Sequence, residues 1–197
     1  MSEFWIFFEN GLRHVLNLYA YDHILFLIVL AVPYAFKDWT RLLLLITTFT
    51  LGHTLALLLS VFGVIIIKGN FTEFLIPITI LIVAGFNLFT AGKSAKKESI
   101  SVIVFITLFF GIIHGLGFAG YFQSLLGSNV KPKLLPVLEF SLGIEMAQLI
   151  VILVVLILSY IVQTFFRFSK RDWTLVLSAF VIGVVLPMII ESKIWYR

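Results

Sequence analysis

Residues 134–165 read LLPVLEFSLGIEMAQLIVILVVLILSYIVQTF, an apolar run with two carboxylates, Glu139 and Glu145, in its first half. A helix needs about 20 apolar residues to cross about 30 Å of hydrocarbon, so this run is long enough to span a bilayer. Five other runs meet the same standard, and the six predicted helices cover residues 14–36, 41–67, 73–92, 99–122, 134–165 and 173–190. We therefore expect an all-α polytopic membrane protein, a bundle of about six transmembrane helices.

The composition of the whole chain agrees with a lipid environment. Hydrophobic residues make up 61% of the sequence and charged residues 12%, with a mean hydropathy of +1.12. A soluble domain of this size could not bury so much apolar surface in one core. The net charge of +4 comes from basic residues placed between the apolar runs, and they form no long patch. We expect no nucleic-acid partner, and a single transmembrane domain over residues 1–197.

The first residues differ in character from the predicted spans. Phe4, Trp5, Phe7 and Phe8 make this opening aromatic, which is typical of a short helix at the membrane interface or of a re-entrant segment. It has no positively charged n-region, so we expect no cleaved signal peptide. Both alternatives for the aromatic opening stay open at this point.

Basic residues in the connectors predict the orientation. The denser clusters follow the first, third and fifth predicted helices, at Lys37 to Arg41, Lys93 to Lys97 and Arg167 to Arg171. The positive-inside rule places these connectors in the cytoplasm. We therefore expect a multi-pass protein of the cell (inner) membrane with both termini outside.

All four histidines lie within or at the edge of predicted spans, and so do three acidic residues; the seven are His14, Asp22, His23, His53, His114, Glu139 and Glu145. An ionisable group at membrane depth costs about 2.5–3.5 kcal/mol or more, so such groups are normally paired, inward-facing and functional. At about 1.5 Å per residue, His53 lies about 18 Å into its helix and Glu145 about 16 Å into its own. Both depths are near the midplane, and four separate segments contribute possible ligands to the central and outer layers.

The spacing of polar residues predicts which helix faces are polar. Thr47, Thr50, His53 and Thr54 follow three- and four-residue steps on one helix, and Ser141, Glu145 and Gln148 do so on another. The glycine-rich sequence around His114 predicts a close helix–helix contact. We interpret His23, His53, His114 and Glu145 as candidate metal ligands, with Thr50, Ser141 and Gln148 beside the pathway.

Two candidates have an alternative structural interpretation. His14 is near the membrane edge, where a hydrogen bond to a carbonyl on the next helix explains it as well as metal binding does. Asp22 and His23 could form a pair in which the carboxylate fixes the imidazole tautomer, beside a metal or in direct contact with it. The sequence has no cysteine, so ligands must be nitrogen or oxygen atoms. Such ligands suit Ni²⁺, Co²⁺, Zn²⁺ or Fe²⁺ and argue against a copper(I) carrier.

The chain resembles the HupE/UreJ family, and five motifs carry the resemblance. They are Gly11-Leu-Arg-His14, Asp22-His23-Ile-Leu-Phe-Leu, Thr47-Thr-Phe-Thr50-Leu-Gly-His53-Thr, Gly111-Ile-Ile-His114-Gly-Leu-Gly-Phe-Ala119 and Gly143-Ile-Glu145-Met-Ala-Gln148-Leu. Glu73 and Asn87 also stand where that family tends to have them. The sequence departs from the family pattern at Ala20-Tyr21, where a glycine often precedes the Asp-His pair, and at Ser141, where asparagine is expected. The resemblance implies a nickel or cobalt permease associated with hydrogenase and urease maturation, and hence a metallochaperone or maturation system as partner.

These observations lead to a functional hypothesis and its rivals. In the first, a permease, Glu73 and Asp22 lead a divalent cation from outside towards His23, His53, His114 and Glu145. The alternative is an intramembrane zinc-dependent hydrolase acting on a lipid-like substrate. A third hypothesis is that paired histidines ligate the iron of a haem group. The sequence leaves open a homo-oligomer and the choice among nickel, cobalt and zinc.

Overall fold

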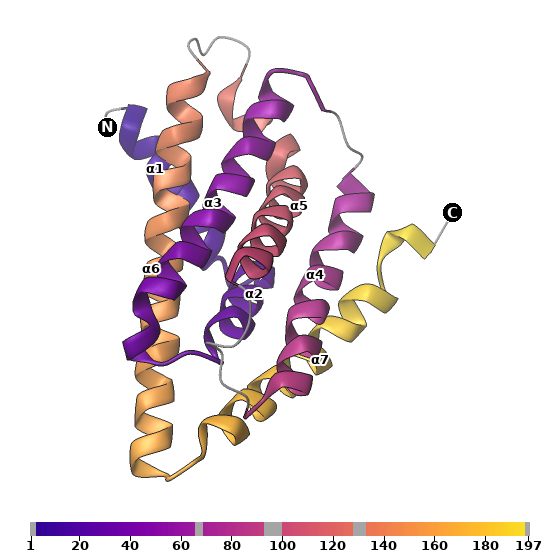
Figure 1. Ribbon diagram of the computed structural model, residues 1–197. Helices are drawn as coiled ribbons and strands as arrows, with labels where there is room; N and C mark the ends of the chain where they lie inside the picture. Colours follow the sequence, from indigo (N-terminus) through magenta and orange to yellow (C-terminus); the bar gives the residue numbers. More distant parts are fainter. Residues whose placement is uncertain (1–2, 66–68, 93–99, 128–132, 196–197) are drawn as a thin grey trace.

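The structure is a computed structural model that describes residues 3–65, 69–92, 100–127 and 133–195, and every regular element in those ranges is helical (Figure 1). The elements are α1 (Glu3–Leu16), α2 (Asp22–Ala31), η1 (Phe36–Asp38), α3 (Trp39–Val61), α4 (Gly69–Thr90), α5 (Ile100–Leu126), α6 (Leu134–Phe165), α7 (Lys170–Ile190) and η3 (Lys193–Trp195). The all-α class predicted from the sequence is confirmed.

Within those ranges, α3, α4, α5, α6 and α7 are the five helices long and apolar enough to cross a bilayer. Large apolar side chains cover the outside of the bundle, among them Phe89, Phe105 and Leu153, and this surface suits lipid rather than water. The polytopic membrane protein expected from the sequence is therefore confirmed.

The first predicted span, residues 14–36, is not one helix. α1 ends at Leu16, and α2 has 10 residues, about 15 Å of helix, which is too short to cross a membrane by itself. The interruption has a local cause, because the Asn17 side chain accepts a hydrogen bond from the Tyr19 N–H at 3.0 Å. The Asp22 carboxylate likewise accepts from the His23 N–H at 2.9 Å. Side chains that bond to nearby backbone in this way compete with helix formation and favour a turn.

α1 and α2 nevertheless run one after the other along α5. The ring pairs in chain order are Phe7 with Phe122, His14 with Phe118, His23 with His114, and Phe26 with Phe110. The partners on α5 descend by about one turn at each step, so both short helices run antiparallel to α5. Together α1 and α2 have 14 and 10 residues, enough for about 36 Å of helix. The two short helices thus stand in place of the first of the six predicted spans, and the other five correspond to the long helices.

Glycines bring the site-bearing helices into close contact. At Gly111 on α5, a Cβ atom would collide with the Phe49 carbonyl of α3, and at Gly115 it would collide with the His53 backbone. Gly11 on α1 and Gly143 on α6 face each other's backbones in the same way. Small residues permit such close approach between helices in membranes. These contacts pack α5 closely against α3, and α1 closely against α6.

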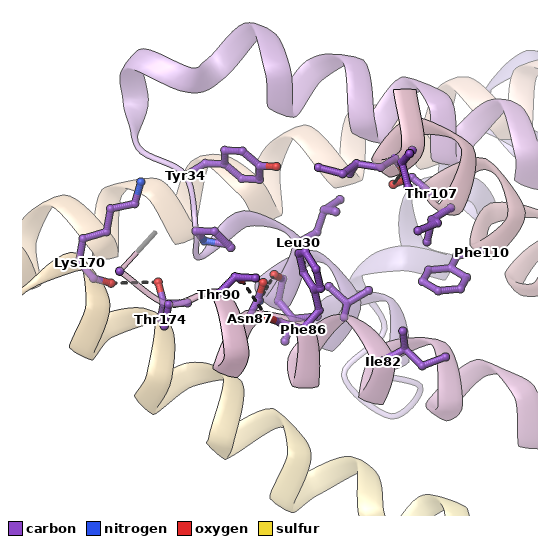
Figure 2. Close-up of a pocket in the computed structure, with 18 of the residues that line it drawn as sticks. Leu30, Tyr34, Ile82, Phe86, Asn87, Thr90, Thr107, Phe110, Lys170 and Thr174 are labelled. Atoms are coloured by element: carbon purple, nitrogen blue, oxygen red, sulfur yellow. Dashed lines mark hydrogen bonds between the residues drawn. The ribbon is translucent and has the colours of Figure 1, made fainter. Parts of the chain in front are cut away.

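A second feature lies towards the end of the bundle where α4 ends and α7 begins. There α2, α4, α5 and α7 enclose a cavity of about 640 Å³ (Figure 2). Asn87 on α4 lies beside it and donates a hydrogen bond of 2.7 Å to the Val29 carbonyl of α2. This bond ties the short helix α2 to a long one.

Candidate metal centre

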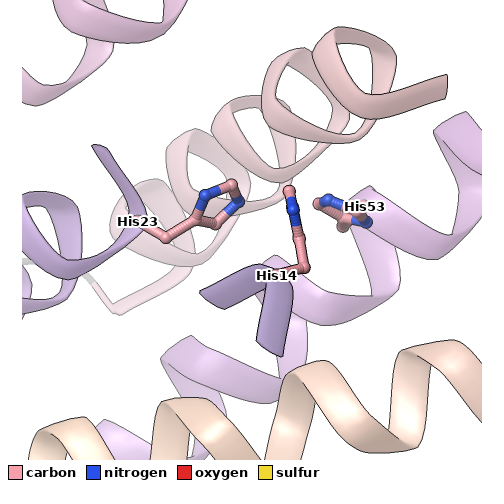
Figure 3. A group of neighbouring side chains, drawn as sticks. All are labelled: His14, His23 and His53. Carbon is pink, nitrogen blue, oxygen red and sulfur yellow. The ribbon is translucent and has the colours of Figure 1, made fainter. Parts of the chain in front are cut away.

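Three histidines from three helices meet at the interruption of the first crossing. His14 lies in the last turn of α1, His23 in the first turn of α2 and His53 in the middle of α3. Figure 3 shows their rings pointing toward one another. One ring nitrogen from each lies within 4.8 Å of those of the other two, and the ring centroids of His14 and His23 are 4.5 Å apart. We call these three residues the histidine cluster.

Most ring nitrogens of the histidine cluster lack a hydrogen-bond partner. Nε2 of His14, Nε2 of His23 and both nitrogens of His53 are buried, and no described residue bonds to them. His53 is 0% exposed and His23 is 3% exposed. A buried polar atom without a partner costs about 1–3 kcal/mol, so proteins rarely leave several together. The histidine cluster therefore concentrates nitrogen atoms that the protein's own hydrogen bonds do not use.

Asp22 orients one member of the histidine cluster. Its Oδ1 lies 3.2 Å from Nδ1 of His23, so the Nδ1–H donates to the carboxylate and the lone pair of Nε2 faces the other rings. A carboxylate behind a ligating imidazole fixes its tautomer and raises its basicity. The Asp22 side chain is 21% exposed, whereas that of His23 is 3% exposed. Asp22 is thus a charged group between the surface and the buried rings.

His114 lies beside the histidine cluster but is not part of the group of three. Its ring centroid is 5.0 Å from that of His23. Its Nε2 lies 3.0 Å from Oγ1 of Thr79, and that hydroxyl donates its single proton to the Ile76 carbonyl at 2.7 Å. His114 must then donate from Nε2, which leaves the lone pair on Nδ1, an atom that is buried with no partner among the described residues.

Aromatic rings surround these imidazoles. The ring of Phe118 lies against His14 with centroids 3.7 Å apart, and Phe26 and Phe49 lie 5.2 Å and 5.1 Å from His114. An apolar shell limits water and lowers the local dielectric, which strengthens any interaction between the imidazoles and a cation. Aromatic rings from α2, α3 and α5 thus cover the imidazoles, while the Asp22 side chain is partly exposed.

Glu145 lies outside the group of three histidines and is bonded to α3. Its Oε1 accepts a hydrogen bond of 2.6 Å from Thr47, and its Oε2 accepts one from Thr50. Both carboxylate oxygens are bonded to α3, and the group of possible ligands found in the described ranges does not include this residue. We call Glu145 with Thr47 and Thr50 the glutamate station.

The other residues of the two predicted polar stripes also face each other. Thr54 donates to Ser141 at 2.7 Å, and Ser141 donates to the Val137 carbonyl at 2.8 Å. Thr50 also lies 3.3 Å from the side-chain oxygen of Gln148. The two polar stripes thus join α3 to α6. His53 lies at the edge of the α3 stripe and points toward the other two histidines of the cluster.

The two residues that the family resemblance added lie on α4. Glu73 is exposed near the start of this helix, and Asn87 is buried and bonded to α2 as described above. The sequence interpretation missed Thr79, which orients His114, and Phe118, which covers His14. Thr79 was a polar residue in an otherwise apolar run, and this was the one signal that could have identified it.

Comparison with known proteins adds a family match. A family model described as HupE / UreJ protein matches residues 1–192, nearly the whole chain. No curated protein and no solved structure gives a significant match.

Proposed function

The chain belongs to the HupE/UreJ family, and on that basis we propose that it is a permease that carries a divalent transition-metal cation, Ni²⁺ or Co²⁺, across the membrane. Membership supports nickel or cobalt handling by a multi-pass membrane protein at a general level. The observation that supports transport of the ion through this chain is the histidine cluster. Its imidazoles come from three helices and have buried nitrogens that no described residue uses.

Imidazole nitrogens suit these ions, and no thiolate is available to compete. A metal–nitrogen bond is about 2.1 Å long, so two nitrogens on one ion lie about 3–3.5 Å apart. The nitrogens of His14, His23 and His53, now within 4.8 Å of one another, would close by about 1 Å around the cargo. Three imidazoles leave coordination positions for water, so the ion keeps part of its hydration. Such partial replacement allows both entry and release.

Charge also favours entry at the interruption of the first crossing. Asp22 is partly exposed, and it lies directly behind His23. A carboxylate at that place attracts a cation and offsets part of its charge once the ion is among neutral imidazoles. Exposed Glu73 would contribute to the same attraction at the outer surface, and His114, next to His23, would be the next position along the path.

Uptake of radiolabelled Ni²⁺ into proteoliposomes tests the proposal. The wild-type protein should accumulate the ion, and the double variant His23→Leu with His53→Leu should not. The matched control is Ser178→Ala, which removes a buried polar atom of α7 that has no partner in the described chain. Uptake by the double variant equal to that of the control would refute the permease.

The same three imidazoles favour a second candidate, an intramembrane zinc-dependent hydrolase, because three histidines are a known ligand set of catalytic zinc. In that case the ion would stay with the protein. Elemental analysis after purification distinguishes the two functions. One zinc ion per chain that resists dialysis, together with no Ni²⁺ uptake, favours the hydrolase; exchangeable Ni²⁺ with uptake favours the permease.

A further inference from the structure

The cavity between α2, α4, α5 and α7 differs from the histidine cluster in the residues that line it. Most of its lining is apolar, and Ile82 and Phe86 on α4 and Val102 and Ile106 on α5 are exposed on the outside of the bundle as well. Residues that both line a cavity and face lipid show that the cavity opens sideways between α4 and α5. Its volume of about 640 Å³ is in the range that holds a small amphiphilic molecule.

One end of this cavity is cationic. Lys170 and Thr174, near the start of α7, line it (Figure 2), and Arg171 lines it as well. The Arg171 side chain lies over Gly92, the last described residue before the 93–99 segment. Among the residues that the structure describes, neither cation forms a salt bridge. The cavity therefore combines an apolar interior with two positive charges at its rim.

Within the described ranges, no acidic side chain forms an ion pair with either of these two cations. Asp172 bonds to the Ser169 hydroxyl at 2.6 Å and accepts no bond from either cation. Asp38 lies near enough to Lys170 to attract it, but Lys37 beside it repels the same ammonium group. Four neutral polar groups of the lining donate to backbone carbonyls: Asn87 to Val29, Thr90 to Phe86, Thr107 to Ile103, and Thr174 to Lys170 at 2.9 Å. In the part of the chain that the structure describes, Lys170 and Arg171 thus remain available to an anion.

We propose that this cavity binds an anionic phospholipid, with an acyl chain between α4 and α5 and the phosphate at Lys170 and Arg171. A free phosphate would use the cationic end but gain nothing from the apolar interior. A zwitterionic lipid would fill the interior but gain less from two unneutralised cations. The basic connectors place this end of the bundle in the cytoplasm in the predicted orientation, where anionic headgroups attract basic residues. The proposal does not depend on metal transport.

Native mass spectrometry of the purified protein with equal amounts of phosphatidylglycerol and phosphatidylcholine tests the headgroup. The wild type should retain phosphatidylglycerol in about tenfold or greater preference, because each basic residue near the headgroup favours an anionic lipid. Lys170→Gln with Arg171→Gln should remove this preference. The matched control, Arg13→Gln with Lys193→Gln, removes two exposed cations elsewhere and should retain it. Equal retention of the two lipids by the wild type, or an unchanged preference in the Lys170/Arg171 variant, would overturn the proposal.

A second pair of variants tests the apolar interior and separates the lipid from a free anion. Ile106→Trp fills the cavity with both cations intact and should reduce phosphatidylglycerol binding, while Leu153→Trp on the lipid-facing side of α6 should not. Lys170→Arg with Arg171→Lys conserves charge and should keep the preference, which guards against a loss caused by misfolding. Inorganic phosphate should not displace the bound lipid. Displacement by phosphate, or full binding by Ile106→Trp, would instead indicate an anion site without a lipid.

Discussion

The histidine cluster and the glutamate station share helix α3 but are opposite in their hydrogen bonding. In the glutamate station, both oxygens of Glu145 accept bonds from threonines. In the histidine cluster, both nitrogens of His53 are buried with no partner among the described residues. Both sites hold an ionisable side chain, but His53 is fully buried, whereas Glu145 is half-buried beside the exposed Thr47.

The difference indicates separate roles for the two sites. A carboxylate whose oxygens are bonded to two hydroxyls stabilises the contact between α3 and α6, and a metal ion would have to displace those bonds. Imidazoles without partners destabilise the ion-free protein, and a bound cation would recover that cost. The comparison thus favours the histidines as ligands and the glutamate as a structural residue, and four variants test it.

The largest effect is expected for His53→Leu. This change removes a nitrogen ligand and should lower Ni²⁺ affinity by more than about 100-fold, beyond the range seen when a residue behind a ligand is lost. The ion-free protein should be as stable as the wild type or more stable, because an apolar side chain of similar size replaces a buried group without partners. Equilibrium dialysis and thermal unfolding measure the two effects. A Ni²⁺ affinity equal to that of the wild type would show that His53 is not a metal ligand.

Asp22→Asn should have the next largest effect. The amide cannot offset the charge of the ion or hold the His23 tautomer as the carboxylate does, so Ni²⁺ affinity should fall by about 10–100-fold. Asp38→Asn is the control, because Asp38 accepts a bond from the Ala35 N–H at 3.1 Å in the connector before α3. Equal affinities of the two variants would show that Asp22 acts through the turn alone.

His114→Gln separates the binding of Ni²⁺ from its transport across the membrane. If the ion contacts His114 after it leaves the histidine cluster, Ni²⁺ uptake by this variant should fall by about tenfold. That change corresponds to an increase of about 1.4 kcal/mol in the free-energy barrier to transport. Equilibrium affinity should change much less. Thr107→Val, which removes a buried hydroxyl elsewhere on α5, is the control. A parallel loss of affinity and uptake would make His114 a fourth ligand.

The smallest effect on metal binding is expected for Glu145→Gln. Ni²⁺ affinity should change by less than about twofold, as expected for a site that shares no partner with the histidine cluster. The free energy of unfolding should fall by about 1 kcal/mol, because the amide nitrogen cannot accept the bond from a threonine hydroxyl. A tenfold loss of affinity would contradict the structural role and restore Glu145 as a ligand.

The apolar runs were sufficient to predict the helical class and most of the spans. They did not predict the interruption after Leu16, because hydropathy averaged over twenty residues hides a short turn. The signal was present in Asn17 and Asp22, whose short polar side chains bond to neighbouring backbone. Average hydropathy therefore predicted one helix over residues 14–36, whereas the structure has a turn there between α1 and α2.

Helical spacing also predicted polar faces but not their partners. At about 100° per residue, Thr50 and Thr54 are about 40° apart on α3, while His53 lies about 100° from Thr54. The threonines therefore face α6, and His53 points past them to α1 and α2. The pairing of Glu145 with threonines instead of histidines depends on this offset and on how the helices pack around it, and a single sequence does not contain the packing.

The turn between α1 and α2 determines whether the imidazoles of His14 and His23 can coordinate the same ion. His14 and His23 are nine positions apart, so on an unbroken helix they would be separated by about 13.5 Å along the axis and would project from opposite sides. No single cation could bridge them. In the proposed metal site, the turn would therefore form the backbone of a chelate ring, and straightening it would abolish chelation while leaving every proposed ligand residue in the chain.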